Sequence, residues 1–161
     1  MYTGPKIVEN GLALYLDAGN PKSYPGTGLT WYDRTQNGNN GTLVNGPTFN
    51  SGNGGNLVFD GVDDNVQTPL NILGCNNTTQ IVWYKWSLIN QTGVMTYIGN
   101  TNINGMGFYV NSGANNGTAG NKVSVLYGGV YYNALNVGTL FATLTTNWTQ
   151  LTLTRDTLTT R

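Results

Sequence analysis

Apolar and polar residues alternate with a period of two along most of the chain. Every second residue is apolar in the stretches 12–16, 57–59, 123–127 and 151–153. In the stretch 81–86 apolar residues occupy both faces, with Ile81 and Trp83 on one face and Val82, Tyr84 and Trp86 on the other. Alternation of this kind is typical of β-strands. Because no stretch has the apolar spacing of an amphipathic helix, we expect an all-β chain.

Asparagine–glycine pairs separate these stretches, at 10–11, 37–38, 40–41, 45–46, 104–105 and 116–117. Both residues tolerate the positive φ that tight turns between strands require. Short strands divided by such turns predict a sandwich or a barrel of antiparallel sheets. We expect a single β-domain over residues 11–161, preceded by an N-terminal arm at residues 1–10.

The charge of the chain is low and balanced, and this excludes several classes of partner. Only 9% of the 161 residues are charged, with 7 lysines and arginines against 7 aspartates and glutamates. Without a basic patch, neither nucleic acid nor an anionic membrane surface is an expected partner. The sequence has no secretory signal, and no apolar run reaches the roughly 18 residues of a membrane span. We therefore expect a soluble protein that would reach the outside of a cell by a route such as lysis.

The residues that most enzymes use for catalysis are scarce. The chain has no histidine, which excludes catalytic triads and the imidazole ligands of most metal sites. Its single glutamate, Glu9, lies before the first expected strand, so the paired carboxyl groups of a glucanase do not line one strand. Cys75, the single cysteine, is expected to be a small buried apolar residue rather than a reactive thiol. We expect no enzymatic activity.

Three ordered motifs occur in the first half of the chain: GLALYLDAGNPKSYPGTGLTWYD, NGNNGTLVNGPTF and GGNLVFDGVDDNV. In order and content they resemble the concanavalin A-like lectin/glucanase superfamily, and most closely its laminin-G-like group, common in phage virion proteins and bacterial surface proteins. The similarity continues more loosely through IVWYKWSL and NWTQLTLTRD, and so covers most of the chain. The resemblance implies a jelly-roll sandwich of two antiparallel sheets that often binds glycans or acts as a spacer, sometimes with calcium.

The chain departs from the family pattern at three places. DRTQNG replaces the usual Asp-x-Ser-Gly-Asn-Gly, so the loop at residues 34–36 is expected to differ. Asn65 stands where an aromatic residue often follows the aspartates. The family continues with at least one more strand after NWTQLTLTRD, whereas this chain ends at Arg161. We favour a fragment of a longer polypeptide that lacks its last strands, the alternative being a neighbouring subunit that supplies the missing strand.

An acidic stretch in NLVFDGVDDNV contains Asp60, Asp63, Asp64 and Asn65. Carboxylate and amide oxygens are the ligands that calcium prefers, and this ion takes about six to eight of them. The spacing is not that of an EF-hand, and an aspartate in a turn commonly accepts hydrogen bonds from nearby backbone amides. We favour a plain turn, with calcium binding as the next interpretation and a catalytic pair as the last. No cofactor is required by the sequence.

Glycan binding needs exposed aromatic rings beside polar groups, because rings stack on the apolar faces of sugars. The residues that we expect to be exposed and to contact a ligand are Tyr24, Trp31, Tyr32, Tyr131 and Tyr132, with Asn133 as a hydrogen-bond partner. For Trp83, Trp86 and Trp148, which lie within strong strand patterns, we favour the core.

These observations favour a non-enzymatic, lectin-like domain of a phage virion or a bacterial surface protein, with loops that contact host glycans. The alternative is a purely structural virion module that mediates contacts between subunits, which an open sheet edge would suit. A polysaccharide depolymerase is the weakest hypothesis. In each case we expect the domain to act in a homo-oligomer or a larger assembly, on a virion or at a cell surface.

Overall fold

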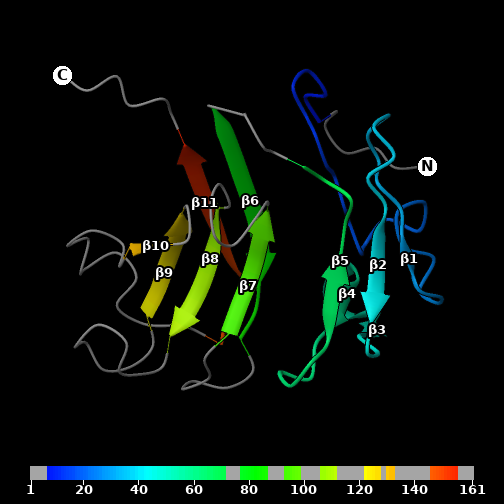
Figure 1. Cartoon of the computed structure of the whole chain (residues 1–161). Coiled ribbons are helices and arrows are strands. Elements are labelled where there is room, and N and C mark those ends of the chain that lie inside the picture. The colour runs from blue at the N-terminus through cyan, green and yellow to red at the C-terminus, as the bar shows by residue number, and fades with distance from the viewer. Residues whose placement is uncertain are drawn as a thin grey trace. The chain divides into compact units, whose positions relative to one another are not determined.

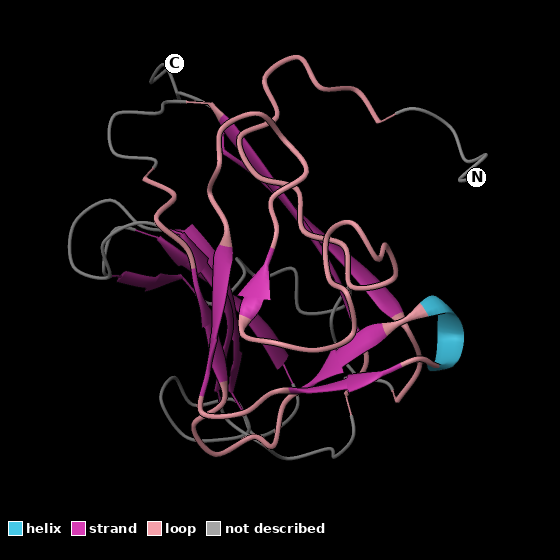
Figure 2. Ribbon diagram, turned by 90° about the vertical axis from the view of Figure 1, so that its right-hand side faces the viewer, coloured by secondary structure: helices cyan, strands magenta, loops and turns pink. Residues whose placement is uncertain are grey.

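The computed structural model describes residues 7–71, 77–86, 93–98, 106–111, 122–127, 130–132 and 146–155, and for the strands between residues 93 and 132 it describes the backbone. The chain divides into two compact units, Met1–Leu70 and Asn71–Arg161 (Figure 1). All the strand pairs in the described ranges are antiparallel. The one helical element in these ranges is a short 3₁₀ turn, η1 (Gly52–Gly54) (Figure 2). The prediction of an all-β chain is confirmed. None of these residues forms a helix long and apolar enough to cross a bilayer.

The first unit contains two small sheets built from five short strands. Their bounds are β1 (Thr30–Trp31), β2 (Gly41–Val44), β3 (Thr48–Asn50), β4 (Asn56–Val58) and β5 (Asn65–Gln67). One sheet has the order β1-β2-β5, and the other pairs β3 with β4. The chain therefore leaves one sheet at β4 and enters the other at β5, and the connection between them, residues 59–64, carries the aspartates of the acidic stretch.

The core of the first unit forms where the loop before β1 packs against β2 and β3. Leu43 of β2 and Tyr24 are buried, and the Tyr24 ring lies against Phe49 of β3 with the ring centroids 5.6 Å apart. Gly41 stands at a close approach between strands, because a Cβ atom there would lie 2.8 Å from Cγ1 of Val66 in β5. The glycine of this asparagine–glycine pair is thus required for space rather than for a positive φ.

The stretch 12–16 keeps its apolar alternation but does not form a strand, contrary to the expectation from its pattern. Side-chain amides bond its backbone instead. Asn37 Nδ2 donates to the carbonyl oxygens of Leu12 and Ala13, at 3.0 and 3.1 Å, and Asn39 Nδ2 donates to that of Ala13 at 3.0 Å. These amides satisfy backbone acceptors that a neighbouring strand would otherwise bond. We call Asn37 and Asn39 the amide clamp.

The six described strands of the second unit form two antiparallel sheets. Their bounds are β6 (Thr78–Tyr84), β7 (Gly93–Ile98), β8 (Met106–Asn111), β9 (Lys122–Tyr127), β10 (Val130–Tyr132) and β11 (Thr149–Arg155). Strands β7 to β10 form a meander in which each strand pairs with the next. β6 pairs with β11 along its whole length, although these two strands are the first and the last of the unit.

The paired strands β6 and β11 bury one face of their ladder. Leu151 of β11 is buried at its centre, directly opposite Val82 of β6. Val82, Tyr84, Trp86 and Leu153 pack against Leu151. The Tyr84 and Trp86 rings meet edge to face, with centroids 6.2 Å apart. The expected division of β6 into two faces is confirmed, and so is the placement of Trp86 at the core.

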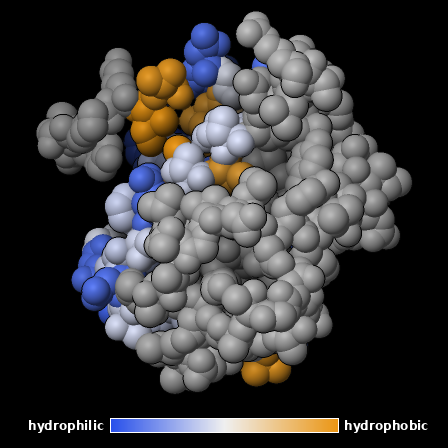
Figure 3. Space-filling model, turned by 90° about the vertical axis from the view of Figure 1, so that its left-hand side faces the viewer, coloured by the Kyte–Doolittle hydropathy of each residue, from blue (hydrophilic) through white to orange (hydrophobic). Residues whose placement is uncertain are grey.

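The opposite face of the same ladder is exposed, which corrects the expectation for two tryptophans. Trp83 is 63% exposed and Ile81 is 58% exposed, while Trp148, just before β11, is also exposed. The prediction that Trp83 and Trp148 belong to the core is wrong, because the ladder buries only the side that carries Leu151. Apolar surface among the described residues is visible in orange in Figure 3.

Candidate functional site

The acidic stretch forms a compact turn between β4 and β5. Asp60 Oδ1 accepts hydrogen bonds from the backbone N–H groups of Val62 and Asp63, at 2.8 and 3.4 Å. The Asp60 N–H donates in turn to Asp64 Oδ2 at 2.9 Å, which closes the turn from its other end. Gly61 supplies a positive φ of 78°. The favoured interpretation, a turn bonded by its own aspartates, is confirmed.

A second loop fixes this turn from the side. Asn45, in the connection between β2 and β3, donates from Nδ2 to the Asp63 carbonyl oxygen at 3.0 Å, and Asn65 Nδ2 donates to the same oxygen at 2.9 Å. Asn45 adopts a φ of 68°, which asparagine tolerates better than most residues. Asn65 Oδ1 accepts a hydrogen bond from Gln67 Nε2 at 3.2 Å. The Asn65 amide oxygen, a candidate ligand in the calcium interpretation, therefore accepts a hydrogen bond within β5.

The carboxylates of the turn lie close enough together to share a cation. One oxygen from each of Asp60, Asp63 and Asp64 lies within 4.8 Å of the other two. The Val62 N–H is the largest cause of a lowered pKa for the Asp60 carboxyl, and burial acts in the opposite direction. Asp60 is therefore ionised at neutral pH, which suits a turn or a metal ligand. It does not suit a general acid, whose pKa must be raised.

Calcium fits this turn only as a partly hydrated ion. One oxygen from each of Asp60, Asp63 and Asp64 could hold the ion, and water would supply the remaining ligands of the six to eight that calcium takes. The hydrogen bonds that shape the turn join its own residues. Calcium binding at this turn stays a prediction.

Tyr24 is buried, which corrects its expected exposure. Its side chain is 4% exposed, its hydroxyl donates to the Gly28 carbonyl oxygen at 2.9 Å, and its ring packs against Phe49. The physical reason is that residues 25–28 turn back over the ring, so its polar tip is bonded locally. A ring without a free face cannot stack on a sugar, and we no longer propose Tyr24 as a ligand contact.

Trp31 and Tyr32 differ in exposure although they are adjacent. Trp31, on β1, is half-buried, and its indole Nε1 is buried with no hydrogen-bond partner among the described residues. Tyr32 is 46% exposed, and its backbone N–H donates to the Ser23 carbonyl oxygen at 2.7 Å. Among the aromatic candidates whose side chains are described, Tyr32 is the one that reaches the surface.

Ser23 fixes the backbone of Tyr32. This serine is fully buried, and its Oγ donates to the Tyr32 carbonyl oxygen at 2.7 Å while it accepts the Asp17 N–H at 3.1 Å. Both backbone groups of Tyr32 are therefore bonded to one residue. The sequence analysis did not identify Ser23, because an isolated serine in a loop carries no pattern of its own.

Asp33, the residue after Tyr32, is buried and fully hydrogen-bonded. Its Oδ1 accepts the N–H groups of Tyr15 and Thr35, at 3.0 and 2.9 Å, and its Oδ2 accepts the Thr35 hydroxyl and the Asn39 N–H, at 2.6 and 3.0 Å. Burial is the largest single influence on the pKa of Asp33 and raises it, but these hydrogen bonds together hold the pKa below 3.8. The signal in the sequence was the threonine two residues after the aspartate in DRTQNG. We call Ser23 and Asp33 the polar frame.

The remaining ligand candidates lie in the second unit or outside the described residues. Tyr131 and Tyr132 lie on β10, opposite Leu126 and Val125 of β9. Asn133 is outside the described residues, so its role as a hydrogen-bond partner stays a prediction, as do the roles of the two tyrosines.

No protein-family model, no characterised protein and no solved structure matches the chain. The resemblance to the concanavalin A-like superfamily therefore depends on the three motifs in the sequence. Its consequences for architecture and ligand are proposals.

Proposed function

We propose that the chain is a non-enzymatic, lectin-like binding domain of a phage virion or a bacterial surface protein, and that its loops contact glycans. The architecture that belongs to this proposal is a two-sheet jelly-roll sandwich of the concanavalin A-like type. The three sequence motifs support both parts of the proposal. Antiparallel pairing throughout the described strands, and the long connection between the paired strands β6 and β11, are consistent with them.

The observation that carries the proposal is an exposed aromatic side chain on a fixed loop. Tyr32 is exposed, Ser23 bonds both of its backbone groups, and the side chain of the next residue, Asp33, is bonded to Thr35. Aromatic rings stack on the apolar faces of sugars, and a side chain whose backbone is already ordered loses little entropy on binding. The loop surface around Tyr32 therefore has the properties of a small glycan platform.

The lowered pKa values of Asp33 and Asp60 favour binding over hydrolysis. A retaining or inverting glycosidase needs one carboxyl group with a raised pKa, paired across the sugar bond with a second carboxylate. The pKa values of Asp33 and Asp60 are both lowered, and both oxygens of Asp33 are bonded inside the loop. Neither residue has the properties of a proton donor to a leaving group.

A glycan array probed with the intact protein, with and without calcium, tests the proposal. We expect binding that is lost on Tyr32→Ala and kept on Phe59→Ala, because Phe59 is an equally exposed aromatic residue beside the acidic turn. No binding under either condition would remove the lectin proposal. Release of reducing ends from a bound polysaccharide, abolished by Asp60→Asn, would instead establish a depolymerase.

The exposed face of the β6–β11 ladder favours a second candidate function, a structural virion module in a capsid decoration, baseplate or fibre. Ile81 and Trp83 place two large apolar side chains on this face, and such surface favours contacts between subunits. Sedimentation should then show defined oligomers that dissociate on Trp83→Gln and persist on Val62→Gln, which changes an exposed apolar residue of the first unit. A stable monomer at high concentration would contradict this function.

A further inference from the structure

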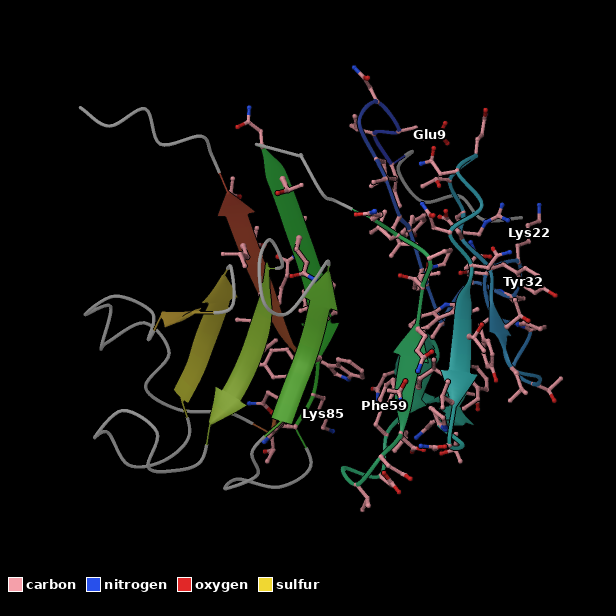
Figure 4. All side chains as sticks on the ribbon, viewed as in Figure 1. Glu9, Lys22, Tyr32, Phe59 and Lys85 are labelled. Carbon is pink, nitrogen blue, oxygen red and sulfur yellow. The ribbon has the colours of Figure 1, made fainter. Side chains whose placement is uncertain are left out.

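Two cationic side chains flank Tyr32 on the surface of the first unit. Lys22 and Arg34 are exposed, and Arg34 Nη1 donates to the Lys22 carbonyl oxygen at 3.4 Å, which brings the guanidinium group to the Lys22 segment. The Tyr32 N–H is bonded to Ser23, the residue after Lys22, so the two segments lie side by side. Figure 4 shows Lys22 and Tyr32 close together on the same side of the first unit. We call Lys22, Tyr32 and Arg34 the cationic patch.

The local backbone explains why these side chains gather on the surface. Exposure alternates along the extended segment that follows β1, with Tyr32 and Arg34 exposed and Asp33 buried between them. Lys22 is likewise exposed beside the fully buried Ser23. The polar frame that fixes Tyr32 therefore also directs both cations outward.

No acidic group among the described residues neutralises the cationic patch. Lys22 and Arg34 are the only cations between residues 7 and 70, and neither forms an ion pair with any residue that the structure describes. The Asp33 carboxylate is turned inward to four donors. The Asp17 carboxylate accepts the Tyr15 hydroxyl and the Gly19 N–H. Two neighbouring cations without an anionic partner form a site where an anion gains charge-assisted hydrogen bonds.

We infer that the cationic patch binds a sugar that carries a carboxylate, such as a hexuronic acid or a sialic acid. The inference depends on the proposed glycan-binding function and names its ligand class. The planar guanidinium of Arg34 pairs with both oxygens of a carboxylate, Lys22 adds a second positive charge, and the Tyr32 ring stacks on the sugar. Two cations match a single carboxylate, whereas binding to a nucleic acid commonly engages about 6–10 phosphates.

Binding to immobilised oligogalacturonate and sialyllactose, compared with the carboxyl-reduced form of each, tests the inference. We expect each acidic sugar to bind about tenfold more tightly, or better, than its carboxyl-reduced form. The affinity for the acidic sugar should fall as sodium chloride is added. Arg34→Gln and Lys22→Gln should each weaken binding of the acidic forms about tenfold and leave the reduced forms unaffected. Arg34→Lys keeps the charge but loses the planar fork, and should fall between Arg34→Gln and the wild type.

Lys85→Gln is the matched control, because it removes an exposed cation from the second unit and should change nothing. Equal binding of acidic and carboxyl-reduced sugars would overturn the inference but not the proposed function. A folded Arg34→Gln variant that still binds the acidic sugars fully would have the same consequence. Absence of binding to every sugar overturns both. Circular dichroism and the melting temperature of each variant distinguish a lost contact from a lost fold.

Discussion

Ser23 and Asp33 illustrate how single polar residues order the first unit. Its buried apolar residues, Tyr24 and Leu43, are few, whereas the polar frame ties together segments that are far apart in the sequence. A buried hydrogen bond contributes about 1 kcal/mol, and a buried donor left without its acceptor costs about 1–3 kcal/mol. Much of the order in the loops therefore depends on a few side chains that no hydrophobic pattern reveals.

Replacing Asp33 by asparagine should destabilise the first unit by about 2 kcal/mol. The new amide group cannot accept at both positions, so the Asn39 N–H or its neighbours lose their acceptor. Urea unfolding measures the loss, and hydrogen exchange at the Tyr15 amide, which donates to Asp33, locates it. Asp63→Asn is the control, since Asp63 is exposed, and it should change stability by less than about 0.5 kcal/mol. Equal effects of the two changes would contradict the role of the frame.

The acidic turn gives a prediction about calcium. Because hydrogen bonds between its own residues hold the turn, we expect calcium to raise the melting temperature no more than magnesium does. An ion present at 100 times its dissociation constant would add about 2.7 kcal/mol, which calorimetry detects easily. A stabilisation specific to calcium and absent in Asp63→Asn would show that the turn is a metal site.

At the scale of elements, the alternation located β4, β6, β9 and β11 but did not show which of their faces are buried. Alternation in 81–86 correctly divides Ile81 and Trp83 from the residues that pack on Leu151. It could not show which set is buried, because that depends on the pairing of β6 with β11, the most distant strand of the unit. The stretch 12–16 has the alternation of a strand, but side-chain amides bond its backbone. The period of the apolar residues does not distinguish a backbone bonded to a neighbouring strand from one bonded to side chains.

Leu151→Ala should destabilise the second unit by about 3 kcal/mol, because it removes the buried centre of the β6–β11 ladder. Thr152→Ala, on the exposed face of the same strand, should cost less than about 1 kcal/mol. Thermal unfolding of both variants checks the difference. Comparable losses would mean that both faces of the ladder are buried.

Gly41→Ala should destabilise the first unit by about 1–3 kcal/mol, because the added methyl group would lie 2.8 Å from Val66 Cγ1. The double variant Gly41→Ala/Val66→Ala relieves this contact, so it should be more stable than the sum of the two single changes indicates. A double-mutant cycle by urea unfolding measures the coupling. Strict additivity would show that the two residues do not meet.

At the scale of the whole molecule, we expect the two units to respond to opposite extremes of pH. The pKa of Asp33 is lowered in the fold, so its contribution to stability is present above its ordinary value of 3.8 and is lost as pH falls through the folded value. Burial raises the pKa of Tyr84 above 10.0, partly opposed by a hydrogen bond with Thr149. Its contribution is present below 10.0 and is lost as pH rises through the folded value.

Acid should therefore unfold the first unit first, and alkali should first loosen the second. Hydrogen exchange at both pH extremes, resolved by peptide, checks the order. Asp33→Asn should weaken the loss of stability in acid without changing the loss in alkali. Tyr84→Phe should weaken the loss in alkali without changing the loss in acid. Simultaneous loss of both units at either extreme would contradict this assignment.

The amide clamp also makes the chain sensitive to chemical ageing. Asn37 precedes a glycine, and such pairs slowly release ammonia and become aspartate or isoaspartate on storage. That conversion would turn a donor to the Leu12 and Ala13 carbonyl oxygens into a negatively charged group that they repel. Old preparations should thus lose the hydrogen bonds that Asn37 donates to Leu12 and Ala13, and the beginning of the first unit should loosen.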